Sequence, residues 1–276
     1  VILINEIAYD SEDSPGFVKG SAPGSNGQRF ADQYLAQKQV EGVEPMNFRA
    51  FMAPSNTGVS SGFDLDNDGS ITTTYPTPPG ADAQGNPGKQ TPAGRKYGND
   101  CWGFGTFPGQ YAMALLVDER LELQSEQART FQRLPWDYLP GNFMPLGADG
   151  TPWFNDDEKK LMRLSSKSHW DVPVALPNGS IVHFLCSHPT PPSFDGPEDR
   201  NGKRNHDEIA FWMEYITDQP WIVDDENRLG GLAIDSHFVI LGDLNADPGA
   251  GDSHKNPAGK LLSHAFVNND LTPASD

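Results

Sequence analysis

The sequence has few cysteines, few basic residues and no long hydrophobic run. With only Cys101 and Cys186, no disulfide framework holds the fold, although a single Cys101–Cys186 disulfide is left open. Lys and Arg number 20 against 38 Asp and Glu, and the net charge of −18 argues against a broad basic surface that grips a nucleic-acid backbone. No stretch approaches the roughly 20 apolar residues of a membrane-spanning helix.

Chain length and loop-forming residues indicate the domain organisation. A chain of 276 residues can bury a full core and is most simply one large domain. Its 28 Gly and 24 Pro predict long ordered loops between few regular elements. The region 60–94 is dense in Gly, Pro and Thr, and we interpret it as a loop insertion. The chain begins on an apolar run without Met, which favours a processed or trimmed piece.

The segment 238–248 combines a strand with a polar cluster. It begins with Phe-Val-Ile-Leu, an apolar run typical of a strand buried on both faces. Gly242 ends the run, and Asp243, Asn245 and Asp247 follow at alternate positions. Alternation in an extended chain places these side chains on one side. A capping turn needs only one such residue, so we interpret the segment as a strand end that carries catalytic groups.

Two further apolar runs end in candidate functional residues. The run Val1–Ile7 predicts a buried strand with Glu6 near its end. The run that begins at Ser180 predicts another buried strand, which ends in His188. His188 occupies the same place relative to its strand as Asp243 does, which favours a functional role over a core histidine.

A helix is predicted between the strands that precede His188 and Asp243. Asn205 and Glu208 match a capping box, in which an Asx side chain and a Glu three residues later cap the helix start. A stripe at helical spacing follows, made of Ile209, Trp212, Met213 and Ile216. The predicted order is therefore strand, His, helix, strand, Asp-x-Asn.

Two cationic residues lie at the entry of another predicted strand. Lys167 and His169 precede Val172 and Val174, whose alternation marks the strand. Both side chains are candidates for contacting a substrate phosphate. Surface cations without a role in catalysis are an equally good interpretation of the sequence.

The insertion contains a candidate calcium loop. Asp64, Asp66 and Asp68, followed by Gly69, reproduce the first half of a loop that surrounds Ca²⁺ with oxygen ligands. The match ends at Tyr75, where an EF-hand has a bidentate Glu. Because three adjacent carboxylates repel one another unless a cation neutralises them, we predict a structural Ca²⁺ site completed by ligands from elsewhere. An acidic solvated turn is the alternative.

Together these segments resemble the endonuclease/exonuclease/phosphatase superfamily, the metal-dependent phosphoesterases related to deoxyribonuclease I. Gly-Asp-Leu-Asn-Ala-Asp at 242–247 is similar to the family signature GD(L/F)NA(D). Asn5-Glu6 resembles the Gln-Glu pair whose Glu binds the catalytic metal in that family. Phe-Pro-Gly-Gln-Tyr-Ala-Met at 107–113 resembles a pattern of a secreted bacterial branch.

The resemblance implies both a fold and a set of roles. The fold is an α/β, four-layer sandwich of two packed mixed, mostly antiparallel β-sheets flanked by helices, and by this resemblance the sequence lacks N- and C-terminal strands that family members have. Glu6 would bind the catalytic Mg²⁺ or Mn²⁺, and Asp243 would activate the attacking water. His188 would donate to the phosphoryl oxygen, and Asn245 would either donate its amide to a phosphate oxygen or hold the metal-bound water.

The predicted function is a divalent-metal-dependent phosphoesterase that cleaves phosphodiester or phosphomonoester bonds by in-line attack of water. One alternative is a nuclease acting on DNA or RNA, which the acidic charge makes less favoured. Another is a noncatalytic extracellular calcium-binding module of the same fold, against which the four intact catalytic candidates argue. The acidic composition and the resemblance favour a secreted or periplasmic protein, and the oligomeric state is not indicated.

Overall fold

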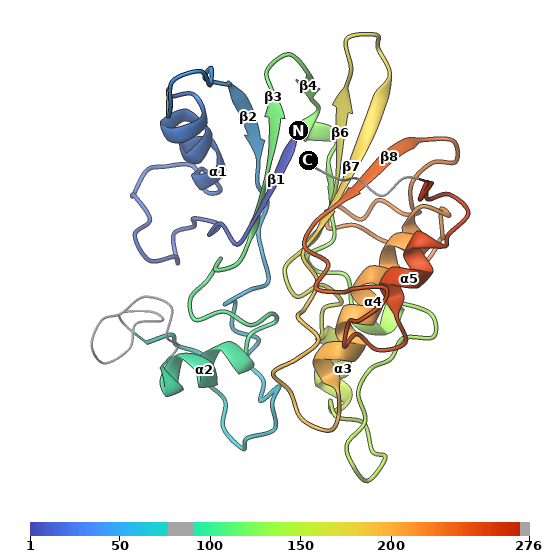
Figure 1. Ribbon diagram of the computed structural model, residues 1–276. Coiled ribbons are helices and arrows are strands. Elements are labelled where there is room, and N and C mark those ends of the chain that lie inside the picture. The colour runs from blue at the N-terminus through green and yellow to red at the C-terminus, as the bar shows by residue number, and fades with distance from the viewer. Residues whose placement is uncertain (77–90, 271–276) are drawn as a thin grey trace. The chain divides into compact units, whose positions relative to one another are not determined.

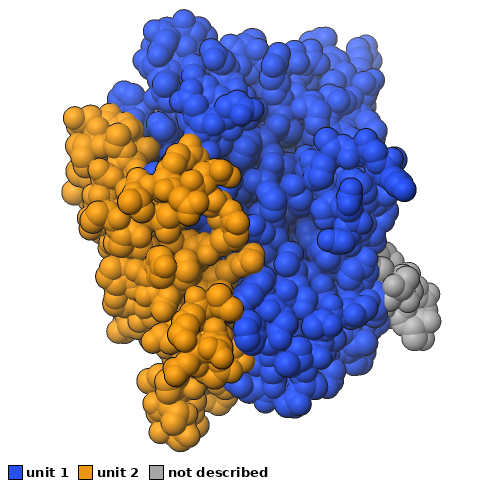
Figure 2. Space-filling model, turned by 180° about the vertical axis from the view of Figure 1, so that it is seen from behind, with its two compact units in different colours: residues 1–132, 165–188, 237–242 blue, residues 133–164, 189–236, 243–276 orange. Residues whose placement is uncertain are grey.

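The computed structural model describes residues 1–76 and 91–270, so part of the predicted insertion lies outside the described residues. The chain forms two compact units, coloured separately in Figure 2. Unit 1 comprises Val1–Gln132, Ser165–His188 and His237–Gly242. Unit 2 comprises Arg133–Leu164, Pro189–Ser236 and Asp243–Asp276. Each unit is described by itself.

Unit 1 contains two β-sheets (Figure 1). The first has the antiparallel order β1-β3-β2, with bounds Ile2–Asn5, Met113–Asp118 and Phe48–Phe51. The second has the order β4-β6-β7-β8, with bounds Glu122–Leu123, His169–Ala175, Ile181–Ser187 and His237–Leu241, and the short strand β5 (Arg129–Thr130) also pairs with β6. Among the named strands of the described residues, only β7 and β8 pair in parallel. The sheets are therefore mixed and mostly antiparallel, as predicted.

Strand β3 separates two apolar cores because its side chains alternate. Met113, Leu115 and Val117 face the second sheet and pack in one cluster with Trp170 and Val172 of β6. Each large side chain buried in this way contributes about 1.5–3 kcal/mol. The two sheets consequently pack face to face.

The opposite face of β3 is covered by helix. Ala114 and Leu116 pack with Ala31 and with Phe48 of β2. Ala31 begins the π-helical turn η1 (Ala31–Leu35), which continues α1 (Asn26–Phe30). Unit 1 therefore supplies three successive layers, helix, sheet and sheet, of the predicted sandwich (Figure 1). Unit 1 also holds α2 (Pro92–Asn99) and the 3₁₀ turn η2 (Ser125–Gln127).

Unit 2 is helical, with α3 (Asp156–Leu161), α4 (Arg200–Tyr215), α5 (Pro257–Leu262) and the 3₁₀ turn η3 (Trp136–Tyr138). The predicted apolar stripe of α4 is largely buried, and Ile209 and Trp212 are fully enclosed. A polar contact joins α4 to α5, since His206 Nε2 lies 3.0 Å from Lys260 Nζ. Within the described residues, no helix combines the length and apolar character needed to cross a membrane.

The predicted start of α4 was wrong. The helix begins at Arg200, after Asp199 in a left-handed conformation, so Asn205 lies inside the helix and does not cap it. Asn205 Nδ2 instead donates to the carbonyl oxygens of Thr190 and Leu244, at 2.8 and 2.9 Å. The Asn side chain thus serves tertiary contacts rather than the helix end.

The two cysteines are free and buried, so the alternative of a Cys101–Cys186 disulfide does not hold. Burial raises the pKa of Cys101 to about 12 and raises that of Cys186 above its ordinary range. Both thiols are protonated at neutral pH and behave as small apolar groups.

Candidate functional site

Strands β1 and β2 end together at one end of the first sheet. Asn5, the last residue of β1, pairs with Met113 at the start of β3. Phe51, the last residue of β2, pairs with Leu115 two positions further on. Because both strands run antiparallel to β3, the residues that follow them leave the sheet where β3 begins.

The second sheet contributes to the same end of unit 1. Cys186 of β7 pairs in parallel with Leu241 of β8, so these two strands also end side by side. Trp170 at the start of β6 pairs with Cys186, and its indole meets the ring of Phe51 edge-on at 5.3 Å. The contact between these rings shows that β2 and β7 finish at the same end of unit 1 (Figure 1).

Four of the predicted site residues lie at this end of unit 1, namely Glu6, Lys167, His169 and His188. His169 is paired with Ser187, the residue before His188. Gly242 follows β8 at the same end, and Asp243 is the next residue in the chain. Topology thus gathers groups that are far apart in sequence, as expected for strand ends at one edge.

Glu6 has an unusual backbone. Its φ is +62°, a left-handed conformation that is costly for a residue other than Gly, Asn or Asp. The preceding Asn5 has a buried Oδ1 that accepts no hydrogen bond from any described group. A buried oxygen acceptor beside an exposed carboxylate matches the hard donors that Mg²⁺ and Mn²⁺ prefer. Asn5 and Glu6 are therefore suited to hold such an ion.

Lys167, His169 and His188 are buried, each with an exposed fraction of 5% or less. This burial is inconsistent with the alternative that the first two are solvated surface cations. Charged or ionisable groups are rarely buried without a specific partner or role.

Asn56 is a structural residue that sequence reasoning missed. Its side chain is fully buried, and Nδ2 donates to the carbonyl oxygens of Gln132 and Ser165, both at 2.7 Å. Its backbone N–H donates to the carbonyl oxygen of Lys167 at 2.8 Å. Asn56 therefore fixes the segment that carries Lys167. No local pattern marks this role, because Gln132, Ser165 and Lys167 are all distant from Asn56 in sequence.

In unit 2, the segment after Gly242 forms a tight turn instead of the extended alternation expected from the sequence. Asp243 Oδ1 accepts from the backbone N–H of Asn245 at 2.9 Å, and Asn245 adopts φ +50°. Asp247 forms its own turn, in which Oδ1 accepts from the N–H groups of Gly249 and Ala250. The three polar residues are thus held individually, and the chain bends between them.

The Asp243–Asn245 turn is tied to the segment that follows His188. Asn245 Nδ2 donates to the carbonyl oxygen of Pro189 at 3.1 Å. Asn205 bridges the carbonyl groups of Thr190 and Leu244, as described above. Buried Glu208 accepts from the Thr190 N–H at 2.6 Å. Within unit 2, the signature turn therefore has a rigid support from α4.

The acidic cluster of the insertion contains a different third residue from the one predicted. Carboxylate oxygens of Asp64, Asp66 and Asp100 all lie within 4.8 Å of one another, which is suitable for a metal ion. Asp68, the expected third ligand, instead pairs with Lys96, with Nζ and Oδ2 2.9 Å apart. The structure thus joins the Asp64 loop to the residue that follows α2.

Asp100 is the most buried member of the cluster. Its carboxylate accepts from the backbone N–H groups of Leu65 and Thr72, at 3.0 and 2.7 Å. Burial, and to a smaller extent the negative charges of Asp66 and Asp64, raise the pKa of Asp100 to about 6. The cluster therefore contains an acid that a cation would strongly favour in its ionised form.

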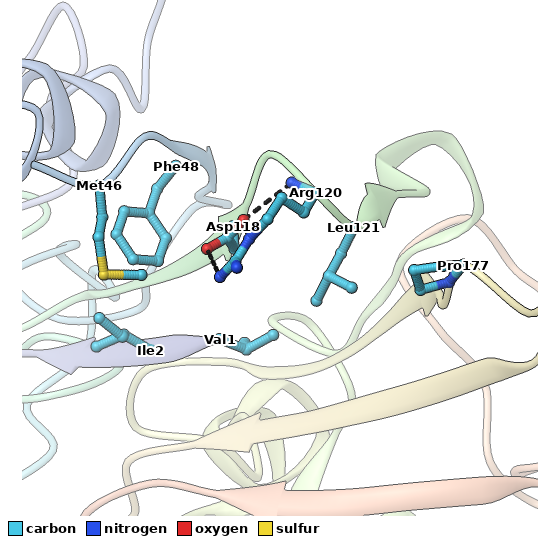
Figure 3. A pocket seen from close by; sticks show the side chains of 8 residues that line it. All are labelled: Val1, Ile2, Met46, Phe48, Asp118, Arg120, Leu121 and Pro177. Atoms are coloured by element: carbon cyan, nitrogen blue, oxygen red, sulfur yellow. Dashed lines mark hydrogen bonds and ion pairs between the residues drawn. The ribbon is translucent and has the colours of Figure 1, made fainter.

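A cavity of about 430 Å³ in unit 1 does not involve any of these residues. It lies where β1 and β2 begin, at the opposite end of the sandwich from Glu6, and the Arg120 side chain there donates two hydrogen bonds to Asp118 (Figure 3). Its walls are otherwise mainly apolar, formed by Val1, Ile2, Met46, Phe48, Leu121 and Pro177. None of the acid, amide and imidazole groups of the candidate site lines this cavity.

Comparison with known proteins identifies a family. Residues 63–276 match the model of the Endonuclease/Exonuclease/phosphatase family. No curated protein and no solved structure matched the chain in the corresponding searches. The family match covers most of the chain and includes His188, Asp243 and Asn245, and the two mixed sheets are consistent with a deoxyribonuclease I-like fold. The chain therefore belongs to the Endonuclease/Exonuclease/phosphatase family.

Proposed function

We propose that the protein is a divalent-metal-dependent phosphoesterase that hydrolyses phosphodiester or phosphomonoester bonds by in-line attack of water. The observation that carries the proposal is the Asp243-Leu-Asn245 turn of the family signature, which unit 2 holds by hydrogen bonds to Pro189 and to Asn205 of α4. A turn fixed in this way keeps its acid and amide groups in one orientation, as catalysis requires.

Each side chain has a separate role in the reaction. Asp243 is exposed and takes the proton of the attacking water. Asn245 uses one amide hydrogen for Pro189, which leaves the second for a phosphate oxygen. His188 donates to the phosphoryl oxygen as negative charge develops there. Lys167 and His169 are proposed to contact the phosphate.

Asn5 and Glu6 would hold the catalytic Mg²⁺ or Mn²⁺, as the buried Oδ1 of Asn5 supports. When bound, the cation supplies positive charge that neutralises the phosphate. The positive charge of the cation is needed because the chain has a net charge of −18 and offers few cationic side chains to a phosphate. The same charge favours small or lipid-like phosphate esters over DNA or RNA.

The proposal is tested by hydrolysis of bis(4-nitrophenyl) phosphate, 4-nitrophenyl phosphate and plasmid DNA with Mg²⁺, with Mn²⁺ and with EDTA. We expect turnover that needs the metal and is greatest for one of the two small esters. Preferred cleavage of DNA would favour the nuclease alternative. Binding of Ca²⁺ without any turnover would instead favour the noncatalytic module.

Glu6→Gln is expected to raise the Mg²⁺ concentration needed for half-maximal activity about tenfold or more, because an amide is a poorer ligand for a hard cation than a carboxylate. A Mg²⁺ titration of the rate measures this shift. Glu12→Gln removes an exposed carboxylate from the neighbouring loop and serves as the matched control. Equal titration curves for the two variants would exclude Glu6 as a ligand.

We further propose that the cluster of Asp64, Asp66 and Asp100 binds a structural Ca²⁺ ion. The ion would pin the long loop to α2, and weak sites of this kind suit the millimolar calcium of a secreted or periplasmic protein. This assignment replaces Asp68 with Asp100 in the predicted ligand set, because Asp68 is already paired with Lys96.

Asp100→Asn is expected to abolish the rise in melting temperature that Ca²⁺ produces, whereas Asp68→Asn retains most of it. Thermal unfolding with and without Ca²⁺ provides the measurement. If the Asp68 variant loses the response and the Asp100 variant keeps it, the loop binds Ca²⁺ as the sequence alone predicted.

The raised pKa of Asp100 also gives a pH dependence. Without a cation, Asp100 stabilises the fold while it is protonated, and this contribution is lost as pH rises from about 4 toward its folded pKa of about 6. Ca²⁺ competes with the proton, so the Ca²⁺-induced rise in melting temperature should be larger at pH 7 than at pH 5.

A further inference from the structure

Phe194 has the most exposed large apolar side chain among the residues that the structure describes. Its exposed fraction is 90%, and the next highest is the 74% of Leu229. Because this phenyl ring lies in water, it adds no stability through burial. Packing within the described structure therefore does not explain its presence.

The backbone of Phe194 is also strained. Its φ is +68°. Among the described residues with positive φ, only four are neither Gly, Asn nor Asp: Glu6, Tyr111, Phe194 and Lys255. A bulky residue in this region persists only where its surroundings impose the conformation, and such positions concentrate at functional sites.

Two contacts with α4 impose the conformation of Phe194. The carbonyl oxygen of Ser193 accepts from Asn201 Nδ2 at 2.6 Å. On the other side, Asp195 Oδ2 accepts from the backbone N–H of Asn201 at 2.6 Å. One helical residue therefore holds both neighbours of Phe194, and the ring between them projects into solvent.

The base of this loop is joined to the signature turn within unit 2. Asn245 donates to Pro189, and Asn205 bridges Thr190 and Leu244. Phe194 is five residues after Pro189, so the two lie within about 18 Å of each other along even a fully extended chain. Helix α4 thus supports both the signature turn and the loop that displays the ring.

The charges of the loop restrict what the ring contacts. Asp195, Glu198 and Asp199 follow Phe194 in sequence, and Arg200 pairs with Glu198. Because Arg200 is engaged with Glu198, it offers no free cation beside the ring for a strand with many phosphates. An uncharged apolar group is compatible with both the acids and the phenyl ring.

We propose that Phe194 determines specificity by contacting an uncharged apolar substituent, aryl or alkyl, esterified to the substrate phosphate. The inference rests on the proposed phosphoesterase function. Phe194 takes no part in proton transfer, and its contact strengthens the binding of substrates that carry such a group.

The test uses three phosphodiesters with the same 4-nitrophenolate leaving group, in which the second substituent is methyl, phenyl or octyl. Phe194→Ala is expected to lower kcat/KM about fivefold for the phenyl or octyl ester and less than twofold for the methyl ester, as befits one lost apolar contact. The phenyl and octyl esters distinguish an aryl from an alkyl preference. Leu229→Ala, which removes a comparably exposed apolar side chain of unit 2, should change none of the values.

Two further variants separate recognition from folding. Phe194→Gly removes the ring and relieves the positive φ, so it should lose the preference while the melting temperature stays equal or rises. Phe194→Tyr keeps a ring and should keep the preference. Equal changes for all three esters, or no change, would overturn the role of Phe194 alone. Absence of metal-dependent turnover of any ester by the unaltered protein would overturn the phosphoesterase proposal as well.

Discussion

Replacing Asp243 with Asn is expected to lower kcat/KM by about 10³-fold, because the amide cannot take a proton from the attacking water. The fold should be preserved. Asp243 is exposed, and the amide oxygen can still accept from the Asn245 N–H as the carboxylate does. Steady-state kinetics with Mg²⁺, together with a melting curve, measure both expectations.

Asp247→Asn is the matched control for this prediction. Asp247 belongs to the same segment, is also exposed and also accepts backbone hydrogen bonds, from Gly249 and Ala250. Its replacement should change kcat/KM less than about threefold, since an amide oxygen supports the same turn. If the two variants lose activity equally, the role of base does not belong to Asp243.

Gly242→Ala is expected to lower the free energy of unfolding by about 3 kcal/mol or more. A Cβ atom at Gly242 would lie 1.8 Å from the carbonyl oxygen of Ser187, far inside any allowed contact. The obstacle is backbone, so β8 would have to move away from β7 at the end where the candidate site begins. Chemical denaturation gives the free energy, and activity should fall with it.

Gly179→Ala is the control that separates the steric clash with Ser187 from the general loss of stability when a glycine is replaced. Gly179 has φ +84°, but no atom lies within 4 Å of a Cβ built there. Its replacement should cost only about 1–2 kcal/mol, the penalty of a left-handed conformation. A Gly242 variant no less stable than the Gly179 variant would show that β7 and β8 have room to separate.

The strands could be predicted because each one is a local apolar run. The expected strand at 1–7 is β1, which spans Ile2–Asn5, and the one expected from 180 to 188 is β7, which spans Ile181–Ser187. Both strands are exposed at their first residues, Ile2 and Ile181, so the apolar run marked the strand correctly but not burial on both faces. The face-to-face packing came from the family resemblance, since a run of this kind does not reveal which sheet it joins.

Helix capping shows that one local sequence pattern can correspond to two different structures. Asn155 and Glu158 have the same spacing as Asn205 and Glu208, and at α3 they do form a capping box. At α4 the carboxylate of Glu208 instead receives the Thr190 N–H. The two pairs have equal spacing and differ in the distant segments that pack on them. Sequence spacing alone therefore predicted one capping box wrongly.

The acidic loop shows the same limit. The alternation of Asp64, Asp66 and Asp68 predicted an ion-binding loop, and the first two residues do lie in the cluster. The third carboxylate comes from Asp100, because Lys96 of α2 draws Asp68 away. A helix that returns to the loop supplies both the competing cation and the replacement acid, and neither is visible from the loop sequence.

The parallel pairing of β7 and β8 has a consequence for how this chain can diverge. A parallel pair cannot be joined by a tight turn, so the chain that leaves after β7 must return to the other end of the sheet before β8 begins. The return path contains α4 and the Phe194 loop. Insertions and deletions along that path alter its length without moving the ends of either strand. The crossover between β7 and β8 is consequently the segment in which related sequences can differ in their loops while the sheet keeps its structure.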